Sequence, residues 1–439
     1  MRHRLNQPKY LFLFLIALSA FVCVGAALAL GLAVDVSLLE ADEKEYYDLA
    51  GELIQGKYEF NLRRPPIHVL MLALLRLVSF DNLVATQVLV SAIFSLTGPL
   101  MYVLVRRITG NNLLAIAVAL LTIFWPPFVY YGSTLYSETT ALPLFVAFLI
   151  LLPRGSVLAA QRDDGWRRCL LAGCLMGLCM LLRPMYLLFG SIAVVILFLE
   201  ERRWLVALRR AIILTIGCCL VVLPWSVYIS AQAGKPVLVS ANGGETLGGG
   251  LNPVLIEQGY KVFIAPNGRQ TWVGPGKWLA EHENGYLNQE ELRLPYDQRD
   301  RLLRQRTIEW ALAHPGSALY LQTAKLLYMW GIYPFWNGVK QTLFGNLPTV
   351  SLIALSILSL LRFRRYWRHL ARFWILPVFV SLVALISWGS WRFRQPGDLG
   401  LIMLGGLFLC SLFVRPSSLI LPKSSQQKAE KILVATQES

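Results

Sequence analysis

The chain has little charge for its length. Only 15% of its 439 residues are Asp, Glu, Lys or Arg, whereas 56% are hydrophobic. A soluble multidomain protein needs far more charge to solvate its surface, so this class is excluded. A spanning helix needs ~20 apolar residues to cross ~30 Å of hydrocarbon, and several segments meet that standard. The composition therefore predicts a polytopic membrane protein.

Cysteine is missing from every loop that would face outward, because all seven cysteines fall in or beside the apolar segments. No outer disulfide is therefore available. Cys169, Cys174 and Cys179 are spaced by five, which drifts around a helix and fits no zinc pattern, so we interpret them as small packing residues. His68 lies near an acidic loop and could bind a metal, but a lone histidine is more often structural.

Ten apolar segments are predicted to span the bilayer. They cover residues 10–34, 83–105, 112–130, 138–152, 168–182, 186–200, 211–230, 343–361, 372–388 and 398–414. The segment 66–80 is apolar but short, and Arg76 interrupts it, so it is expected to lie in the interface or to re-enter. The predicted fold is all-α, with about 10 (9–13) transmembrane helices, interfacial helices in the first outer loop and a small outer segment.

Basic residues predict the orientation, because short loops rich in Lys and Arg stay in the cytoplasm. Such loops recur at 106–107, 154–168, 202–210 and 362–372 and in the tail. Both termini are therefore expected inside, and residues 35–64, 131–137, the turn at Arg183, 232–341 and 389–397 outside. The net charge of +15 is attributed to inner loops facing anionic lipid. No basic and aromatic nucleic-acid module is visible, so no nucleic acid is expected as a partner.

Four parts follow from this organisation. Residues 1–231 form an N-terminal transmembrane core that includes the acidic first outer loop, 35–64. Residues 232–341 form a large outer loop or small domain, residues 342–414 the C-terminal transmembrane helices, and residues 415–439 a cytoplasmic tail. Within the outer part, 297–313 has helical spacing and is expected to rest on the membrane, where it could cover a site. The glycine-rich stretch 242–252 is interpreted as a flexible turn rather than a phosphate cradle.

Three acidic residues stand out in the outer loops. Asp42 and Glu43 open a stretch with the apolar spacing of an amphipathic helix. Glu138 follows Ser137 at the start of a span, where a carboxylate is costly unless it is paired or reaches water. Capping and the helix dipole explain acidic residues at helix starts equally simply, so a structural role stays open for all three.

Arginines break the charge rule in short outer turns. Arg183 precedes Pro184 in a tight hairpin, and Arg392 and Arg394 lie in the turn 392–396. Snorkelling to the interface explains Arg183 as well as an anionic ligand does. Together with Arg63 and Arg64, these exceptions suggest an anion site on the outer face.

The order of these residues resembles a known family. The pattern looks like that of the family 39-like glycosyltransferases of the GT-C fold, whose relatives include protein O-mannosyltransferases and the lipid A aminoarabinose transferase. The residues that carry the resemblance are Asp42-Glu43 with Tyr46, Tyr47, Ala50 and Gly56, Arg64-Pro65-Pro66, Ser137-Glu138, residues 177–184, Leu223-Pro224-Trp225, Asn242-Gly243-Gly244, His314-Pro315-Gly316 and residues 392–396. The resemblance covers most of residues 35–400.

This resemblance implies an integral membrane glycosyltransferase of a bacterial inner or plasma membrane, with its site facing outward. Nucleotide sugars are cytoplasmic, so the donor is expected to be a polyprenyl-phosphate sugar, and protein, glycolipid and polysaccharide acceptors all fit. Asp42 is expected to act as general base in an inverting displacement, with Glu43 in support and Glu138 orienting a substrate. No cofactor is required. Acidic loops can bind a divalent cation, but no paired ligand motif demands one.

The leaving group in this reaction is a phosphate, whose charge must be held in a partly dry site. Guanidinium groups form bidentate, charge-assisted bonds to phosphate, which favours Arg64, Arg183 and Arg392 or Arg394 as its ligands.

Two other classes remain open. A transporter or flippase of a lipid-linked or small anionic substrate would also have about ten spans. It would be expected to place polar groups near mid-bilayer on broken helices and to contain two related halves, and the sequence shows neither. An inactive binding or assembly protein is the other rival, because intact residues do not prove turnover.

Overall fold

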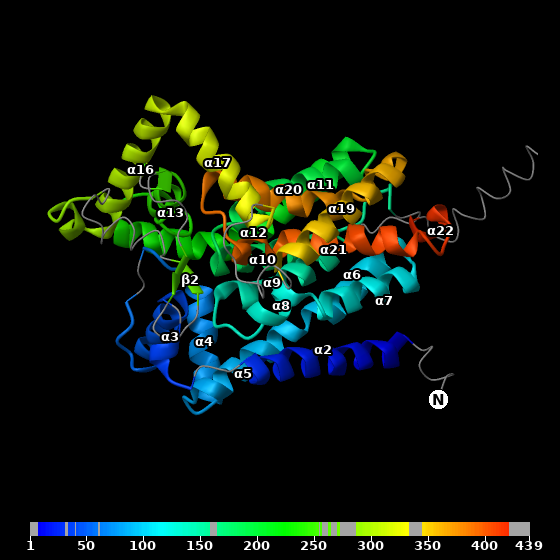
Figure 1. Ribbon diagram of the computed structural model, residues 1–439, viewed down its shortest axis with the longest axis horizontal. Helices are drawn as coiled ribbons and strands as arrows, with labels where there is room; N and C mark the ends of the chain where they lie inside the picture. The colour runs from blue at the N-terminus through cyan, green and yellow to red at the C-terminus, as the bar shows by residue number, and fades with distance from the viewer. Residues whose placement is uncertain are drawn as a thin grey trace, which may run out of the picture.

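The computed structural model describes residues 8–30, 34–39, 41–59, 62–158, 165–253, 255–256, 262–264, 270–272, 287–332 and 345–420. Long helices run side by side through most of the molecule, and shorter helices gather at one end of them (Figure 1). The side-by-side helices are α2 (Pro8–Leu30), α5 (Leu83–Ser95), α6 (Thr97–Thr109), α7 (Asn112–Ile123), α9 (Ser137–Leu151), α10 (Trp166–Leu182), α11 (Tyr186–Glu200), α12 (Trp204–Ala233), α19 (Leu347–Arg362), α20 (Ala371–Ile386) and α21 (Gln395–Cys410).

Among the described residues, three stretches of helix are long and apolar enough to cross a membrane: Lys9–Ala29, Leu83–Thr109, which comprises α5 and α6, and Trp204–Ala233. Several shorter apolar helices accompany them, including those at Ser137–Leu151 and Ala371–Ile386. The protein is therefore an integral membrane protein with a helical fold, as the composition predicts. The expected span at 112–130 is wrong as one helix, because α7 ends at Ile123 and a short helix, α8 (Pro126–Tyr131), follows. Pro126 causes the break, since proline disfavours the helical conformation in the residue before it.

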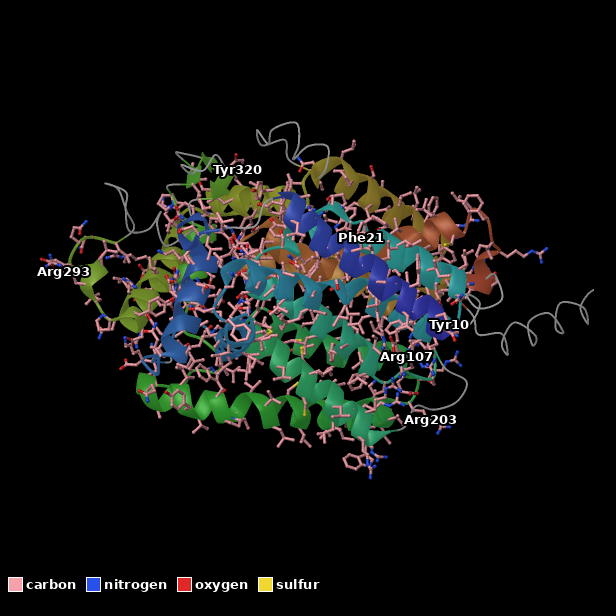
Figure 2. All side chains as sticks on the ribbon, turned by 90° about the horizontal axis from the view of Figure 1, so that it is seen from below. Tyr10, Phe21, Arg107, Arg203, Arg293 and Tyr320 are labelled. Atoms are coloured by element: carbon pink, nitrogen blue, oxygen red, sulfur yellow. The ribbon has the colours of Figure 1, made fainter. Side chains whose placement is uncertain are left out.

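The two ends of the bundle differ in character. Figure 2 shows Tyr10, Arg107 and Arg203 at one end, and Arg293 and Tyr320 toward the other. The basic loops expected inside thus share an end, and the segment expected outside lies at the opposite one. At the first of these ends, η4 (Arg364–Tyr366) connects α19 to α20 and α22 (Pro416–Ile420) follows α21.

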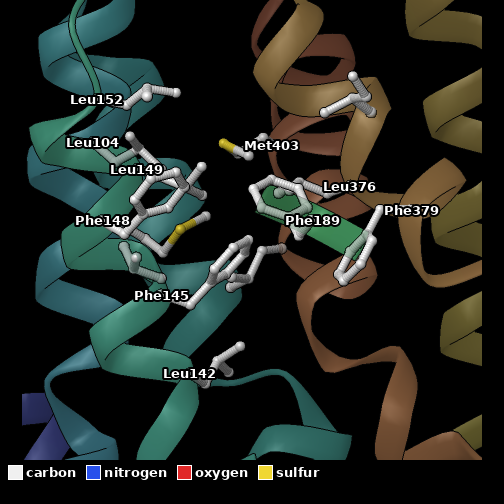
Figure 3. Packing of buried hydrophobic residues seen from close by; sticks show 14 of the residues in the cluster. Leu104, Leu142, Phe145, Phe148, Leu149, Leu152, Phe189, Leu376, Phe379 and Met403 are labelled. Carbon is white, nitrogen blue, oxygen red and sulfur yellow. The ribbon is translucent and has the colours of Figure 1, made fainter. Parts of the chain in front are cut away.

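Aromatic packing joins α9 to α11 and α20. Figure 3 shows Phe189 of α11 between Phe145 of α9 and Phe379 of α20. The ring centroid of Phe189 lies 4.8 Å from that of Phe145 and 4.7 Å from that of Phe379, and both pairs pack edge to face. Each such contact contributes ~0.5–1.5 kcal/mol beyond its buried area. Because lipid is as apolar as these side chains, close packing rather than removal from water holds the helices together.

Small residues join α10 to α12. A Cβ on Gly173 would meet the Leu214 carbonyl oxygen, so the two backbones approach where no side chain intervenes. Cys169 is buried in the same interface and its thiol donates to the Arg210 carbonyl oxygen at 3.0 Å. The interpretation of the spaced cysteines as packing residues is confirmed for Cys169 and Cys179, which are buried, while Cys174 is half-buried.

The described part of residues 35–64, which is expected to form the first outer loop, lies at the same end as the later segment expected outside (Figure 1). After η1 (Val36–Leu38), α3 (Ala41–Ile54) packs on α4 (Pro66–Val78), and Tyr46 and Ala50 are buried in a small core with Leu72. This confirms the predicted amphipathic helix. The guanidinium of Arg76, which interrupts the apolar run of α4, stacks on the Tyr47 ring at 3.9 Å and donates to the Tyr47 carbonyl.

The outer segment contains α13 (Gly243–Gly250), a hairpin of β1 (Val262–Ile264) and β2 (Gln270–Trp272), η2 (Glu291–Arg293), α16 (Tyr296–Ala313) and α17 (Pro315–Met329). The strands are antiparallel, with Phe263 opposite Thr271, so the all-α prediction misses one small hairpin. The predicted helix at 297–313 is confirmed by α16.

The glycine-rich stretch is not the flexible turn that was expected, because it forms the helix α13. A Cβ on Gly244 would clash with the Asp300 carbonyl oxygen of α16. Glycine therefore permits close packing of α13 on α16 here.

Candidate active site

Five side chains from five separate segments meet at the end of the bundle that carries α3 and α4. Each of these residues lies at or next to the end of a helix. Asp42 is in the first turn of α3, Glu138 in the first turn of α9, and Arg183 caps the carboxyl end of α10. Arg64 precedes the proline pair that starts α4, and Arg392 lies in η5 (Trp391–Arg394) between α20 and α21. We call these five residues the arginine–carboxylate cluster.

Acids and bases alternate along this cluster. The two carboxylate oxygens of Asp42 lie 2.7 Å from Nη2 of Arg64 and 2.6 Å from Nη2 of Arg392. Arg392 also places its Nε 2.6 Å from Oε1 of Glu138, so one guanidinium bridges both acids. Oε2 of Glu138 pairs in turn with Nη1 of Arg183. Charge-assisted bonds of this kind are about twice as strong as neutral ones.

The neighbouring arginines keep Asp42 ionised in spite of its burial. Burial alone would raise the pKa of Asp42, but the positive charges of Arg392 and Arg64 outweigh it and hold that pKa well below its ordinary value. The Asp42 side chain is 29% exposed, whereas that of Glu138 is 4% exposed. Asp42 is thus the carboxylate of the cluster that solvent or a substrate can reach.

Aromatic rings flank the guanidinium groups. Arg392 lies over the Tyr136 ring at 4.2 Å and over the Phe393 ring at 4.9 Å. The guanidinium of Arg183 lies 4.8 Å from the centre of the same Phe393 ring, and that of Arg64 lies 4.7 Å from the centre of the Tyr46 ring. Stacking of this kind fixes the planes of the guanidinium groups while leaving their N–H edges for anions.

Two of the predicted site residues do not join the cluster. Glu43 is buried, and its Oε1 accepts a hydrogen bond from the Leu135 backbone N–H at 2.8 Å, so it ties α3 to the loop before α9. Arg394, the last residue of η5, is fully buried; it donates to the Met329 carbonyl oxygen at 2.9 Å and pairs with Asp398 at 3.3 Å. Both residues lie beside the site rather than in it.

Ser137 and His68 both have structural partners near the cluster, and the expectation that His68 is structural is confirmed. Ser137 does not cap α9, since its Oγ instead accepts from Nη1 of Arg183 at 3.0 Å. His68 is fully buried and structural, because Nε2 faces the Leu135 carbonyl oxygen at 2.9 Å and Nδ1 faces the Thr140 hydroxyl at 3.1 Å. A carbonyl only accepts, so Nε2 of His68 carries a proton.

Sequence reasoning missed a second layer of ion pairs beside the cluster. Glu45 pairs with Arg64 and also, at 3.0 Å, with Arg63. Arg63 pairs through its Nη2 with Glu245 of α13 at 2.8 Å, and Glu245 also accepts from the Tyr296 hydroxyl of α16 at 2.6 Å. The spacing of Asp42 and Glu45, one turn apart on α3, is the sequence signal that could have indicated the acid nearest the cluster.

In the part of the chain that the structure describes, no group of three or more His, Cys, Asp or Glu side chains could hold a metal ion. The arginines instead supply the positive charge around Asp42 and Glu138.

Comparison with known proteins finds a family that the central segment resembles. Residues 63–228 match the family model described as dolichyl-phosphate-mannose-protein mannosyltransferase. This segment is similar to that family. The resemblance that the sequence indicates is therefore confirmed, and the matched segment contains Arg64, Glu138 and Arg183, while Asp42 and Arg392 reach the cluster from outside it. The chain matches no curated protein.

Solved structures of an oligosaccharyltransferase share the fold. The apo form from Archaeoglobus fulgidus has a TM-score of 0.54 and 14% identity over 98% of this chain and 55% of its own. The archaeal oligosaccharyltransferase AglB from the same organism, in complex with an inhibitory peptide and a dolichol-phosphate, has a TM-score of 0.51 and 16% identity over 92% of this chain and 50% of its own. The chain thus spans about half the length of the structures it matches, and at this identity the likeness shows the fold alone.

Proposed function

We propose that the protein is a membrane glycosyltransferase that moves a sugar from a polyprenyl-phosphate donor to an acceptor hydroxyl. The observation that carries this proposal is the convergence of Asp42 and Glu138 with three arginines. A phosphate leaving group needs fixed cations, and an attacking hydroxyl needs a carboxylate within reach. The family of residues 63–228 supports the same reaction class, since its description names a lipid-phosphate sugar donor and a protein acceptor.

The proposed step is one displacement at the anomeric carbon. The acceptor oxygen forms a bond to that carbon as the bond to the phosphate oxygen breaks, and the hydroxyl proton passes to the Asp42 carboxylate. The polyprenyl phosphate leaves with the bonding electron pair and is held by arginines. A single attack from the face opposite the leaving group inverts the anomeric configuration.

The resting cluster must rearrange for this step to occur. Asp42 is a weak base while Arg64 and Arg392 both hold it, because its pKa is well below the ordinary value. A donor phosphate offers the same guanidinium groups a competing anion. When the phosphate takes up one of them, the pKa of Asp42 rises toward the range in which a carboxylate accepts a proton.

Glu43 and Arg394 take supporting places in the proposal. Glu43 holds the backbone before α9 through Leu135, and Arg394 fixes the base of η5 through Met329. Both therefore orient neighbours of the cluster rather than contact the sugar or the phosphate. The reaction uses no nucleotide, and no cofactor is assigned to it.

The site is proposed to face the outside of a bacterial inner or plasma membrane. The basic loops lie at the opposite end of the bundle, where the charge rule would keep them cytoplasmic together with both termini. A lipid-borne donor would reach the cluster from the outer leaflet. The acceptor is a hydroxyl of a protein, a glycolipid or a polysaccharide, since each class supplies the same nucleophile.

The test is transfer by the purified protein in lipid nanodiscs. Radiolabelled polyprenyl-phosphate mannose and a nucleotide sugar are supplied separately, with hydroxyl-bearing peptides and glycolipids as acceptors. We expect label to move only from the lipid-phosphate donor. Transfer from the nucleotide sugar alone would contradict the proposal, and solute uptake by reconstituted vesicles without any transfer would favour a transporter.

A further inference from the structure

The segment that delivers Arg392 to the cluster is short. It runs from the end of α20 at Ile386 to η5, and it is held from one side by α17. Trp391 donates through its indole N–H to the Tyr328 carbonyl oxygen at 2.9 Å, and Arg394 donates to the Met329 carbonyl oxygen at 2.9 Å. The carboxyl end of α17 is therefore the surface against which η5 is placed.

Lys325 of α17 is buried at the start of this segment. Its side chain is fully inaccessible, and its ammonium donates to the Ser387 carbonyl oxygen at 2.8 Å. The Leu385 carbonyl oxygen lies 3.5 Å from the same nitrogen and also accepts from Gln322 at 2.9 Å. Within the described chain, Lys325 forms no ion pair, and burial lowers its pKa to about 7.

The chemistry of a helix terminus explains why a lysine is buried there. The last carbonyls of α20 have no partner inside the helix, and that end carries partial negative charge. An ammonium from the neighbouring helix satisfies both needs, whereas an apolar side chain would leave the Ser387 carbonyl without this hydrogen bond. The neutral amine still has N–H groups to donate, so titration near pH 7 does not release the contact.

Two glycines fit closely around this lysine. A Cβ on Gly389 would lie 2.8 Å from the Lys325 carbonyl oxygen and 3.1 Å from its Cγ. A Cβ on Gly250 would lie 2.7 Å from the Ser387 carbonyl oxygen and 3.3 Å from Nζ of Lys325. The chain between α20 and η5 thus has little room to shift around the Lys325 side chain, and its path is set at this point.

We propose that Lys325 is a positioning residue, which sets the place of Arg392 in the arginine–carboxylate cluster. It acts through the backbone at Ser387 and contacts no substrate. The expected effect of Lys325 on transfer kinetics rests on the proposed function, because that function assigns Arg392 to the donor phosphate. The expected effect of Lys325 on structure, which is to fix the path of residues 387–394, does not depend on the proposed function.

The experiment compares Lys325→Met, which keeps the length of the side chain but removes its donor, with Gly389→Ala, which pushes the segment away from an intact lysine. Lys235→Met is the matched control, because Lys235 pairs with Asp297 at 3.0 Å in the outer segment and does not contact α20. Hydrogen exchange of peptides covering 387–394 and transfer kinetics are measured on the full chain in nanodiscs, each normalised to folded protein.

We expect both Lys325→Met and Gly389→Ala to speed exchange in 387–394 and to lower kcat/KM for the donor by about 10- to 100-fold, since a displacement of about 1 Å in a site has effects of that size. The KM for the acceptor should stay unchanged, and the control should match wild type. Normal donor kinetics per folded molecule, or unchanged exchange in 387–394, would overturn the inference. If wild type transfers no sugar but both variants loosen this segment, the proposed function fails and the positioning role stands.

Discussion

Replacing Asp42 with Asn tests the assignment of the general base most directly. Asparagine has nearly the same shape but no negative charge, and only one of its two terminal atoms accepts a hydrogen bond. Asp42 accepts from Arg64 at 2.7 Å and from Arg392 at 2.6 Å through different oxygens. Both ion pairs are lost in the variant, because the amide is neutral. Its oxygen can still accept a hydrogen bond from one guanidinium group, while its nitrogen would face the other as a second donor.

The magnitude follows from the two roles that Asp42 would lose. Loss of a positioned general base lowers kcat by about 10²- to 10⁴-fold. At about 1.36 kcal/mol for each factor of ten, this is about 2.7–5.4 kcal/mol of transition-state stabilisation. The donor KM should fall or stay unchanged, because a guanidinium released from Asp42 is free to bind the phosphate. A falling kcat with a steady or falling KM is the expected signature.

The assay is transfer of radiolabelled sugar from polyprenyl phosphate at varied donor concentration. Asp48→Asn is the matched control, because Asp48 is an exposed residue of the same helix and loses the same charge. A kcat of Asp42→Asn within threefold of wild type would remove the residue from the assigned role. A raised donor KM with normal kcat would mean that Asp42 serves only to order the arginines.

Four further predictions concern the surroundings of the cluster. Arg183→Ala should raise the donor KM or lower turnover in the transfer assay, because it leaves Glu138 with one guanidinium instead of two, and normal kinetics would mean that the arginine is merely snorkelling. Arg63→Glu should loosen α13 from α3 in hydrogen-exchange measurements, and the double variant with Glu245→Arg should restore protection, since the two side chains pair at 2.8 Å. The pKa of Asp42 is depressed in the folded protein. Its contribution to stability is therefore present above the unfolded pKa of about 3.9 and is lost only as pH falls through the lower folded pKa. Thermal melting should accordingly show no destabilisation from this group between pH 7 and about pH 5. Treatment with a chelator should leave transfer unchanged, because arginines occupy both acids of the cluster, and restoration of lost activity by a divalent cation would refute this.

The helical framework and much of the site could be predicted from the sequence, because apolar runs and charged helix ends carry strong local signals. Arg392 and Arg394 could not be separated in that way. They lie two residues apart in a 3₁₀ turn, where three residues complete a turn, so their side chains point in different directions. The sequence does not reveal that this turn is 3₁₀, and only packing against Met329 decides which arginine is buried.

The sequence says more about the difference between Asp42 and Glu43. Adjacent residues on an α-helix point about 100° apart, so both carboxylates could not face one substrate. Which of the two faces the cluster depends on how α3 packs, and that packing is set by Tyr46 and Ala50 against α4. The contact from Arg63 to Glu245 lay beyond sequence reasoning for a different reason, since the two residues lie far apart in the chain and no local pattern joins them.

The charge balance of the site indicates which carboxylate acts as the base. Arg64, Arg183 and Arg392 face three acids, namely Asp42, Glu138 and Glu45, so the resting assembly is neutral. A donor phosphate adds negative charge, and one carboxylate must then give up an arginine. Glu138 is nearly buried, and a buried carboxylate that loses its partner is costly. Asp42 is more exposed and can turn to a hydroxyl at lower cost, so we infer that donor binding itself releases Asp42 for proton transfer while Glu138 keeps Arg183 and Arg392 in place.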